Sequence, residues 1–195
     1  MTLSSPVVAA DIADFAPPED KALVVFIQNL REDRTMTFLV FETDRTCVAE
    51  VGGREARVVP MKPGTHRLYV SSYSSERIEL ELEAGRTYFV RLYTVQRTMA
   101  RKSEVALVRR GTSSYMELRN SLDGAEVTHA SHDRCWGKPL RERKNRTGRR
   151  IVEGDADWNE GGEAYQTEHT LAPDEGFTAQ ELEAMTAAMP GADHE

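Results

Sequence analysis

Met61-Lys62-Pro63-Gly64-Thr65-His66-Arg67-Leu68 opens the stretch of sequence that decides the fold. It continues through Ile78-Glu79-Leu80-Glu81-Leu82 to Ala84-Gly85-Arg86-Thr87-Tyr88-Phe89-Val90-Arg91. Apolar residues at every second position are typical of a strand with one buried face, and the Pro-Gly and Ala-Gly pairs are typical of turns. The stretch therefore predicts successive β-strands joined by tight connections.

The same pattern extends in both directions along the chain. Apolar runs occupy residues 22–28, 36–41, 46–51, 55–59, 65–72, 78–82, 88–93 and 105–108. Gly52-Gly53 lies between two of these runs, and this spacing predicts a two-residue hairpin because glycine reaches the positive φ of primed turns. Regularly spaced short strands predict a mainly β fold, an antiparallel β-sandwich of about eight strands.

One helix is expected directly after the last strand. Ser114-Tyr115-Met116-Glu117 has the spacing of a capping box, with Ser114 as N-cap and Glu117 at the N3 position. Gly124 follows at a position where glycine commonly ends a helix. We expect this helix, over about residues 114–123, to pack on the sandwich.

Length and composition predict one folded domain with extensions. The chain has 195 residues, of which 39% are hydrophobic and 29% charged, and 195 residues are few for two separate cores. We expect an N-terminal extension over 1–20, the sandwich with its helix over 21–124 and a charged linker over 125–176. A short amphipathic docking helix is expected over 177–190.

The N-terminus and the number of cysteines predict the compartment of the protein and the redox state of its cysteines. Residues 1–20 contain neither a basic n-region followed by a long apolar run nor a lipid-attachment cysteine, so we expect a cytoplasmic protein without a membrane span. Cys47 lies in a strand run and Cys135 in a polar stretch. Two cysteines do not make a disulfide framework, and both are expected to be free thiols.

Charge is separated within the C-terminal third. Residues 134–150 carry eight Lys or Arg against one acidic residue, whereas residues 151–195 carry twelve Asp or Glu and no Lys or Arg. The basic run could bind phosphates, with Trp136 stacking on a base. The adjoining acidic residues would compete for the same arginines, so a solvated linker or an intramolecular charge clamp is favoured and nucleic acid is not the expected partner. The partner-contact residues predicted in this run are Arg141, Arg143, Lys144 and Arg146.

A second helix is predicted near the C-terminus. Thr178 and Glu181 have capping-box spacing, and Phe177 and Leu182 have the offset of a hydrophobic staple. Leu182, Met185 and Met189 then share one stripe. A helix of about three turns is marginal alone in water, so this stripe should dock on the sandwich, on a second copy or on a partner. Phe177, Leu182, Met185 and Met189 are therefore the predicted apolar contact residues.

The turn and strand motifs also carry a family resemblance. Pro63-Gly64-x-His66-x-Leu68, the alternating strand 78–82, and Ala84-Gly85-x-x-Tyr88-Phe89-Val90-Arg91 resemble a widespread bacterial domain-of-unknown-function family of small β-sandwich proteins. Many members are predicted lipoproteins, and a similar proline-glycine strand motif occurs in PEGA-type domains. The resemblance covers about residues 22–122. It implies a sandwich without a known enzymatic activity.

Motifs for catalysis, cofactors or metals are weak in this sequence. There is no Gly-x-Ser-x-Gly elbow and no phosphate-binding Gly-x-x-x-x-Gly-Lys loop. His129, His132 and Cys135 are zinc-competent but lack the paired spacing of a structural site. His66 shares a strand face with Leu68, which favours a structural role. We therefore predict no catalytic, cofactor-binding or metal-binding residues, and no enzyme.

Two classes of function remain open at this point. The leading hypothesis is a non-catalytic interaction or structural module that uses its charged C-terminal extension and terminal helix to contact a protein partner or another copy. The alternative is a domain that binds a small molecule or glycan on its loops, which a pocket rich in Tyr, Trp and Arg would favour.

Overall fold

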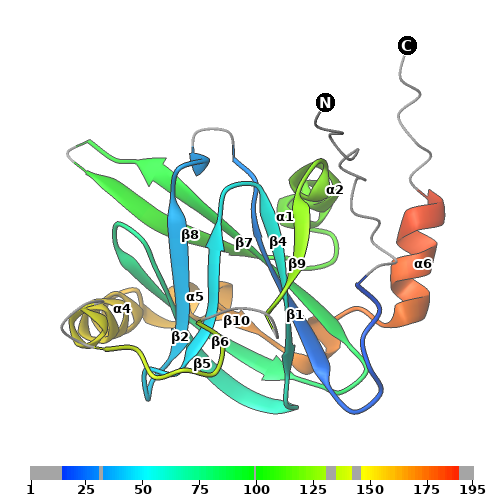
Figure 1. The fold of residues 1–195 in the computed structure, drawn as a ribbon, viewed down its shortest axis with the longest axis horizontal. Helices are drawn as coiled ribbons and strands as arrows, with labels where there is room; N and C mark the ends of the chain where they lie inside the picture. The colour runs from blue at the N-terminus through cyan, green and yellow to red at the C-terminus, as the bar shows by residue number, and fades with distance from the viewer. Residues whose placement is uncertain (1–14, 31–32, 99, 131–134, 142–145, 189–195) are drawn as a thin grey trace, which may run out of the picture.

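The protein is mainly β and consists of two five-stranded sheets (Figure 1). A computed structural model describes residues 15–30, 33–98, 100–130, 135–141 and 146–188, with side chains to residue 185. The first sheet, in spatial order, contains β8 (Arg101–Leu107), β7 (Thr87–Gln96), β1 (Ala22–Gln28), β4 (Glu55–Met61) and β9 (Glu126–His129). The second contains β10 (Thr170–Leu171), β6 (Ser75–Leu82), β5 (Gly64–Ser71), β2 (Thr37–Glu42) and β3 (Cys47–Gly52).

Each of the eight predicted apolar runs overlaps a strand, but the predicted antiparallel, eight-stranded topology is wrong in detail. The described residues form ten strands, and three pairings are parallel: β1 with β7, β4 with β9, and β6 with β10. Two of these pairings involve β9 and β10, which come from the polar segment expected to be a linker. Both strands are short and polar, so apolar periodicity does not predict them.

The connection at Gly52-Gly53 is a turn but not a hairpin. Gly53 has φ +71°, as a tight turn requires, yet β3 belongs to the second sheet and β4 to the first. The Gly52 amide donates to a carboxylate oxygen of Glu55 at 3.0 Å. β4 pairs with β1 along its full length instead, so the chain crosses between the layers here.

A core of side chains from both sheets fills the space between them. The alternation in β6 is confirmed, because Ile78, Leu80 and Leu82 are buried between the sheets. Tyr88, Val90 and Leu92 face the same core from β7 in the opposite sheet. Burial of these side chains removes a large apolar area from water, which is the main stabilising contribution to such a fold.

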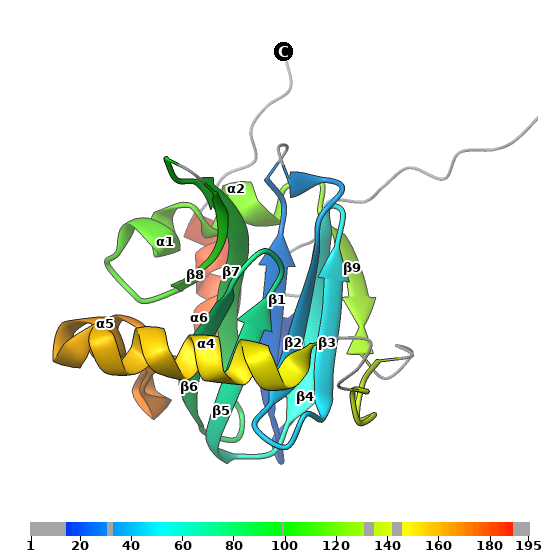
Figure 2. The same cartoon turned by 90° about the vertical axis from the view of Figure 1, so that its left-hand side faces the viewer.

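Helices cover the outer faces of the two sheets (Figure 2). On the first sheet, α1 (Ser113–Met116), α2 (Leu118–Leu122) and α6 (Ala179–Ala188) contribute to a second apolar core with Phe89. On the second sheet lies α4 (Thr147–Glu160), followed by α5 (Gly162–Glu168). A Cβ built on Gly154 of α4 would lie 3.1 Å from the ring of Tyr69, so glycine permits the close approach of this helix.

The helix predicted over residues 114–123 is present as the pair α1 and α2. Its N-cap is Thr112, whose hydroxyl accepts from the Tyr115 amide, and not Ser114. The Ser114 hydroxyl donates to the carbonyl oxygen of Leu107 at 2.9 Å. Gly124 follows α2 with φ +63°, as expected. The Ser114 side chain, which local spacing predicted to be the cap, therefore makes a tertiary hydrogen bond to β8 instead.

The segment expected to be a charged linker over 125–176 is instead part of the folded layers. It supplies β9 to one sheet and β10 to the other, with α4 and α5 between them and a 3₁₀ turn, η4 (Pro173–Glu175), after them. Trp158 of α4 packs beneath the Arg77 guanidinium, with 4.2 Å between the carbon of the guanidinium and the ring centroid. Contacts of this kind depend on tertiary structure and cannot be predicted from composition. No helix in the described ranges is both long and apolar enough to span a bilayer.

The expectation of free thiols is corrected by a disulfide between Cys47 and Cys135, whose Cα atoms are 5.5 Å apart. We call residues 135–141 the strap. The Cys47 amide donates to the Lys138 carbonyl at 2.9 Å, and the Gly137 amide donates to the Cys47 carbonyl at 2.7 Å. The chain leaves β9 at the edge of one sheet and reaches α4 on the other, so the strap passes the edge strand β3. The two cysteines are 88 residues apart in the sequence, and nothing in the sequence predicts that they lie close together.

Candidate functional site

A cleft of about 660 Å³ opens at one lateral side of the two sheets. We call it the lateral cleft. One wall is β8, the edge strand of the first sheet, and the other is formed by β6 with the ends of α4 and α5. Figure 2 shows α5 beyond the end of α4, on the side where β8 lies. The lining residues are Glu76, Tyr93, Arg97, Lys102, Glu104, Val105, Asp157, Glu160, Gly161, Tyr165, Glu168 and His169.

The most unusual residue of the lateral cleft is Glu76. It lies at the start of β6 on the face that carries Ile78 and Leu80, and it is 7% exposed. The Tyr165 hydroxyl donates to its Oε2 atom, and Nε2 of His169 lies 3.5 Å from the same oxygen. A buried carboxylate needs such partners because desolvation of an unpaired charge is costly.

His169 is held in a defined orientation beside this carboxylate. Its Nδ1 atom donates to the carbonyl oxygen of Tyr165 at 2.8 Å, and its ring stacks on the Tyr165 ring with centroids 3.9 Å apart. Because Nδ1 carries a proton, Nε2 faces Glu76 either as a bare acceptor or, when protonated, as a second donor. Burial opposes charging of the imidazole, but the hydrogen bonds to Glu76 and Tyr165 and the charges of Glu76 and Glu168 prevail. The pKa of His169 is therefore raised above its ordinary value.

Tyr165 responds to the same surroundings. Burial, together with the hydrogen bond and the negative charge of Glu76, raises the pKa of its phenol. The phenol thus stays protonated and serves as a donor to the carboxylate. A Cβ at Gly161 would come within 2.5 Å of the Tyr165 side chain, so glycine at the junction of α4 and α5 leaves room for this ring.

β10 joins the end of α5 to the second sheet, and Arg109, which follows β8 of the first sheet, contacts the same segment. The Arg109 guanidinium donates to the carbonyl oxygens of Thr167, Glu168 and Thr170, and it pairs with Glu175 at 2.8 Å. The Glu79 amide of β6 donates to the carbonyl oxygen of His169 at 2.9 Å. Polar contacts to Arg109 and to β6 therefore position the wall that carries Tyr165 and His169.

The charge of the lateral cleft is predominantly negative. Five of its lining residues are Asp or Glu, and two, Arg97 and Lys102, are permanently cationic. Arg97 is already paired with Glu104 at 2.5 Å. Burial and the nearby charges of Glu76, Glu153 and Glu160 raise the pKa of Asp157, despite the opposing effect of Lys102. The cleft thus has more negative charge than its own residues neutralise.

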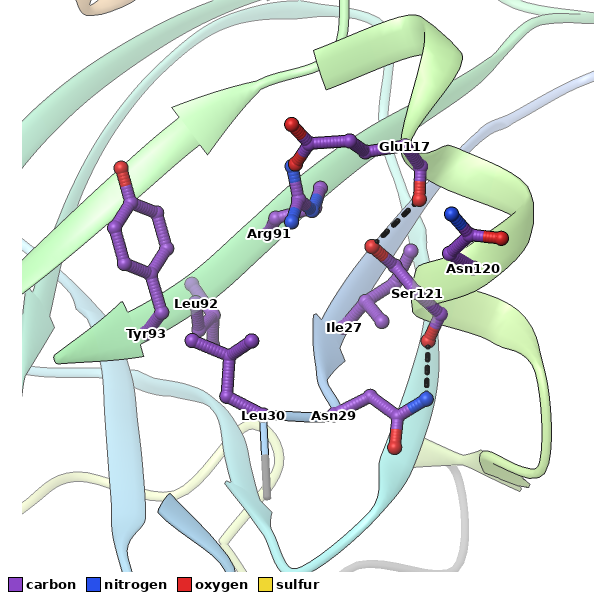
Figure 3. Close-up of a pocket in the computed structure, with 9 residues that line it drawn as sticks. All are labelled: Ile27, Asn29, Leu30, Arg91, Leu92, Tyr93, Glu117, Asn120 and Ser121. Carbon is purple, nitrogen blue, oxygen red and sulfur yellow. Dashed lines mark hydrogen bonds and ion pairs between the residues drawn. The ribbon is translucent and has the colours of Figure 1, made fainter. Parts of the chain in front are cut away.

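A second, smaller hollow adjoins the lateral cleft at Tyr93, which lines both (Figure 3). Its volume is about 250 Å³, and it lies between the end of β1, β7 and α2. Arg91 pairs with Glu117 at 2.5 Å, and the Asn29 side chain donates to the Ser121 carbonyl at 2.9 Å. Because several of its polar groups already bind one another, this hollow offers fewer groups to a ligand than the lateral cleft.

The predicted apolar contact residues lie elsewhere. Phe177, Leu182 and Met185 are buried in the outer core of the first sheet, so α6 docks on its own chain. The predicted capping box is confirmed, because the Glu181 carboxylate accepts from the Thr178 amide at 2.8 Å and the Thr178 hydroxyl accepts from the Glu181 amide. Met189 lies outside the described residues. In this arrangement the three side chains pack against the protein's own first sheet.

The basic run is only partly described. Arg141 and Arg146 are exposed, whereas Arg143 and Lys144 lie outside the described residues. Of the zinc-competent residues, His129 is exposed at β9, Cys135 is in the disulfide, and His132 is also outside the described ranges. The described members of these two sets, Arg141, Arg146, His129 and Cys135, do not line the lateral cleft.

The predicted charge clamp is present in part, and most of its cationic partners lie outside the basic run. Acidic residues of the C-terminal segment pair with arginines of the sheets and their loops: Asp155 with Arg77 at 2.9 Å, Glu175 with Arg109 at 2.8 Å and Glu181 with Arg110 at 2.9 Å. From the basic run, Arg150 pairs with Glu153 at 2.7 Å. Charge content alone could not distinguish these two sets of arginines.

Sequence reasoning missed Glu76, Tyr165 and His169. One signal was present for Glu76, since a charged residue at the position that continues the apolar face of a strand requires a partner or a site. Tyr165 and His169 are four residues apart, the spacing that places two side chains on one helical face. Nothing in the sequence connected that face to β6.

No protein-family model matches the sequence, and no curated protein matches it.

Proposed function

We propose that the protein is a non-catalytic β-sandwich binding module that takes a ligand with a cationic group into the lateral cleft. The observation that carries the proposal is the buried Glu76 carboxylate at the cleft, held by Tyr165 and His169 from the C-terminal extension. An acidic hollow with aromatic rings suits a cation, which gains from both carboxylates and π-faces. The extension thus takes part in binding through α5, and α6 serves as its anchor.

A binding role fits the site better than catalysis. The lining residues include no Ser, Thr or Cys nucleophile. The obvious base, His169, already donates through Nδ1 to a carbonyl and faces Glu76 with Nε2. With both ring nitrogens engaged inside the protein, the imidazole is poorly placed to take a proton from a ligand.

The test is titration of the full chain with small amines, using isothermal calorimetry and amide chemical shifts. Spermidine and agmatine are the cationic probes, glutarate is the anionic probe and glucose the neutral one. We expect the amines alone to bind, with shifts centred on β8 and α5. Binding of none of the four probes at the lateral cleft would overturn the proposal, and binding of glucose there would favour a glycan-binding domain.

Substitution separates the cleft from general electrostatic attraction. Glu76→Gln should weaken amine binding on the order of 10- to 100-fold, because a desolvated charge partner is lost. Glu81→Gln, on the same strand but exposed, removes the same charge and should leave binding within about twofold. If Glu76→Gln fails to fold, Glu160→Gln at the exposed rim is the second variant. Equal affinities for the rim variant and the Glu81 control would contradict the proposal.

A further inference from the structure

A second charged surface lies on the opposite side of the molecule. Within the described ranges, most arginine side chains have hydrogen bonds or ion pairs to protein groups, and those that have none are Arg34, Arg141, Arg146 and Arg149. Three of these four lie between the end of the strap and the first turn of α4. Lys138 of the strap is likewise exposed and has no side-chain partner among the described residues.

Within the described residues, acidic side chains of the C-terminal segment pair mainly with arginines outside this region. Asp155, Glu175 and Glu181 pair with arginines from the sheets and their loops and not with the basic run. In the described part of the basic run, Arg150 pairs with an acidic neighbour, Glu153, whereas Arg141, Arg146 and Arg149 have no acidic partner among the described residues. An exposed group of unpaired cations raises the local positive potential and attracts anions.

Apolar side chains are exposed in the same region. Trp136 of the strap is 38% exposed, and Val152 in the second turn of α4 is 68% exposed. The other tryptophan, Trp158, is buried beneath Arg77. Figure 2 shows the strap and the N-terminal end of α4 on the same side of the molecule, next to β3 and β9. We call Trp136, Lys138, Arg141, Arg146, Arg149 and Val152 the basic strap surface.

We propose that the basic strap surface docks on an anionic lipid bilayer. Cations beside an exposed tryptophan match the chemistry of a membrane interface, where phosphate headgroups lie next to acyl chains. The disulfide that fixes the strap forms and persists in oxidising compartments, in which a membrane surface is a more available polyanion than nucleic acid. The two observations together favour lipid as the partner.

The test measures binding of the full chain to vesicles of phosphatidylcholine with and without phosphatidylglycerol, by co-sedimentation and tryptophan fluorescence. We expect binding to the anionic vesicles alone, weakened by added salt, with a blue shift that disappears in Trp136→Phe. Tight binding to duplex DNA without binding to anionic vesicles would overturn the proposal. So would vesicle binding that leaves the tryptophan emission unchanged.

A matched pair of triple variants tests the surface itself. Arg141→Ser, Arg146→Ser and Arg149→Ser together should weaken vesicle binding on the order of 100-fold, because each cation near an anionic surface contributes a comparable share. The control replaces Lys21, Arg34 and Lys62 by Ser, which are exposed cations without a side-chain partner in the described chain. The control has the same net charge and should bind like the native protein. Equal loss in both triple variants would contradict a defined surface.

Discussion

The two lateral sides of this protein are closed in different ways. At the side of β3 and β9, the strap bridges the sheets through the Cys47–Cys135 disulfide and backbone hydrogen bonds. At the side of β8 and β10, no strand or covalent bond joins the sheets in the described residues, and a cleft remains. There, Tyr165 of α5 and His169, the residue that follows α5, satisfy the buried Glu76 carboxylate.

The two kinds of closure respond differently to solution conditions. A disulfide and a backbone ladder restrict the chain whatever the solution conditions, within the limits of redox state. Side-chain contacts to a carboxylate respond to pH, to salt and to a competing ligand. The covalently closed side is thus suited to present a rigid surface, and the open side to exchange internal partners for external ones.

Removing the disulfide is the strongest way to break this contrast. Cys47→Ser with Cys135→Ser should lower the free energy of unfolding by about 4 kcal/mol, the size expected for a cross-link that closes a loop of this length. Hydrogen exchange should quicken over residues 135–141, while α5 stays protected. Guanidinium denaturation and exchange mass spectrometry measure the two effects.

A reductant provides the control for that experiment. Dithiothreitol should destabilise the native protein by a similar amount and leave the double variant unchanged. A double variant as stable as the native protein would show that backbone pairing alone closes this side. Intact mass under non-reducing conditions, with thiol alkylation, verifies that the cysteines are paired.

On the side of β8 and β10, polar contacts of Arg109 hold the layers together, where the other side has a disulfide. Arg109→Gln loses hydrogen bonds to three carbonyl oxygens and the ion pair with Glu175, so we expect a loss of about 1–3 kcal/mol in the free energy of unfolding. Arg34→Gln, at an exposed arginine without a described partner, should change it by less than about 0.5 kcal/mol. Exchange should quicken in α5 and β10 but not in the strap. Identical denaturation curves for the two variants would refute the role given to Arg109.

The sequence predicted those parts of the fold that depend on local patterns. Alternation identified the strands, including the buried face of Ile78, Leu80 and Leu82, and the capping box at Thr178 was found from spacing alone. Pairing partners could not be found this way. Gly52-Gly53 has hairpin chemistry, but the choice between a ladder to β3 and one to β1 depends on contacts distant in sequence.

The candidate site was less accessible to sequence reasoning for the same reason. Glu76, Tyr165 and His169 meet only because β10 pairs with β6 and Arg109 holds the end of α5. The predicted contact residues Phe177, Leu182 and Met185 were recognised as an apolar stripe, but its destination was not. Amphipathic patterns show that a surface is covered without showing what covers it.

The pH dependence of His169 gives the smallest effect and the sharpest comparison between the two sides. Its pKa is raised in the folded protein, so its contribution to stability is fully present below the unfolded value of about 6.5 and is lost as pH rises through the folded value. The advantage of the native protein over His169→Gln in the free energy of unfolding should therefore shrink between about pH 5 and 8. His129→Gln, at the exposed position on β9, is the control substitution outside the lateral cleft. The affinity of the lateral cleft for amines should rise as pH rises, because deprotonation of His169 removes the positive charge that competes for Glu76. An amine affinity that falls over the same pH range, measured by calorimetry, would show that the cation does not use this carboxylate.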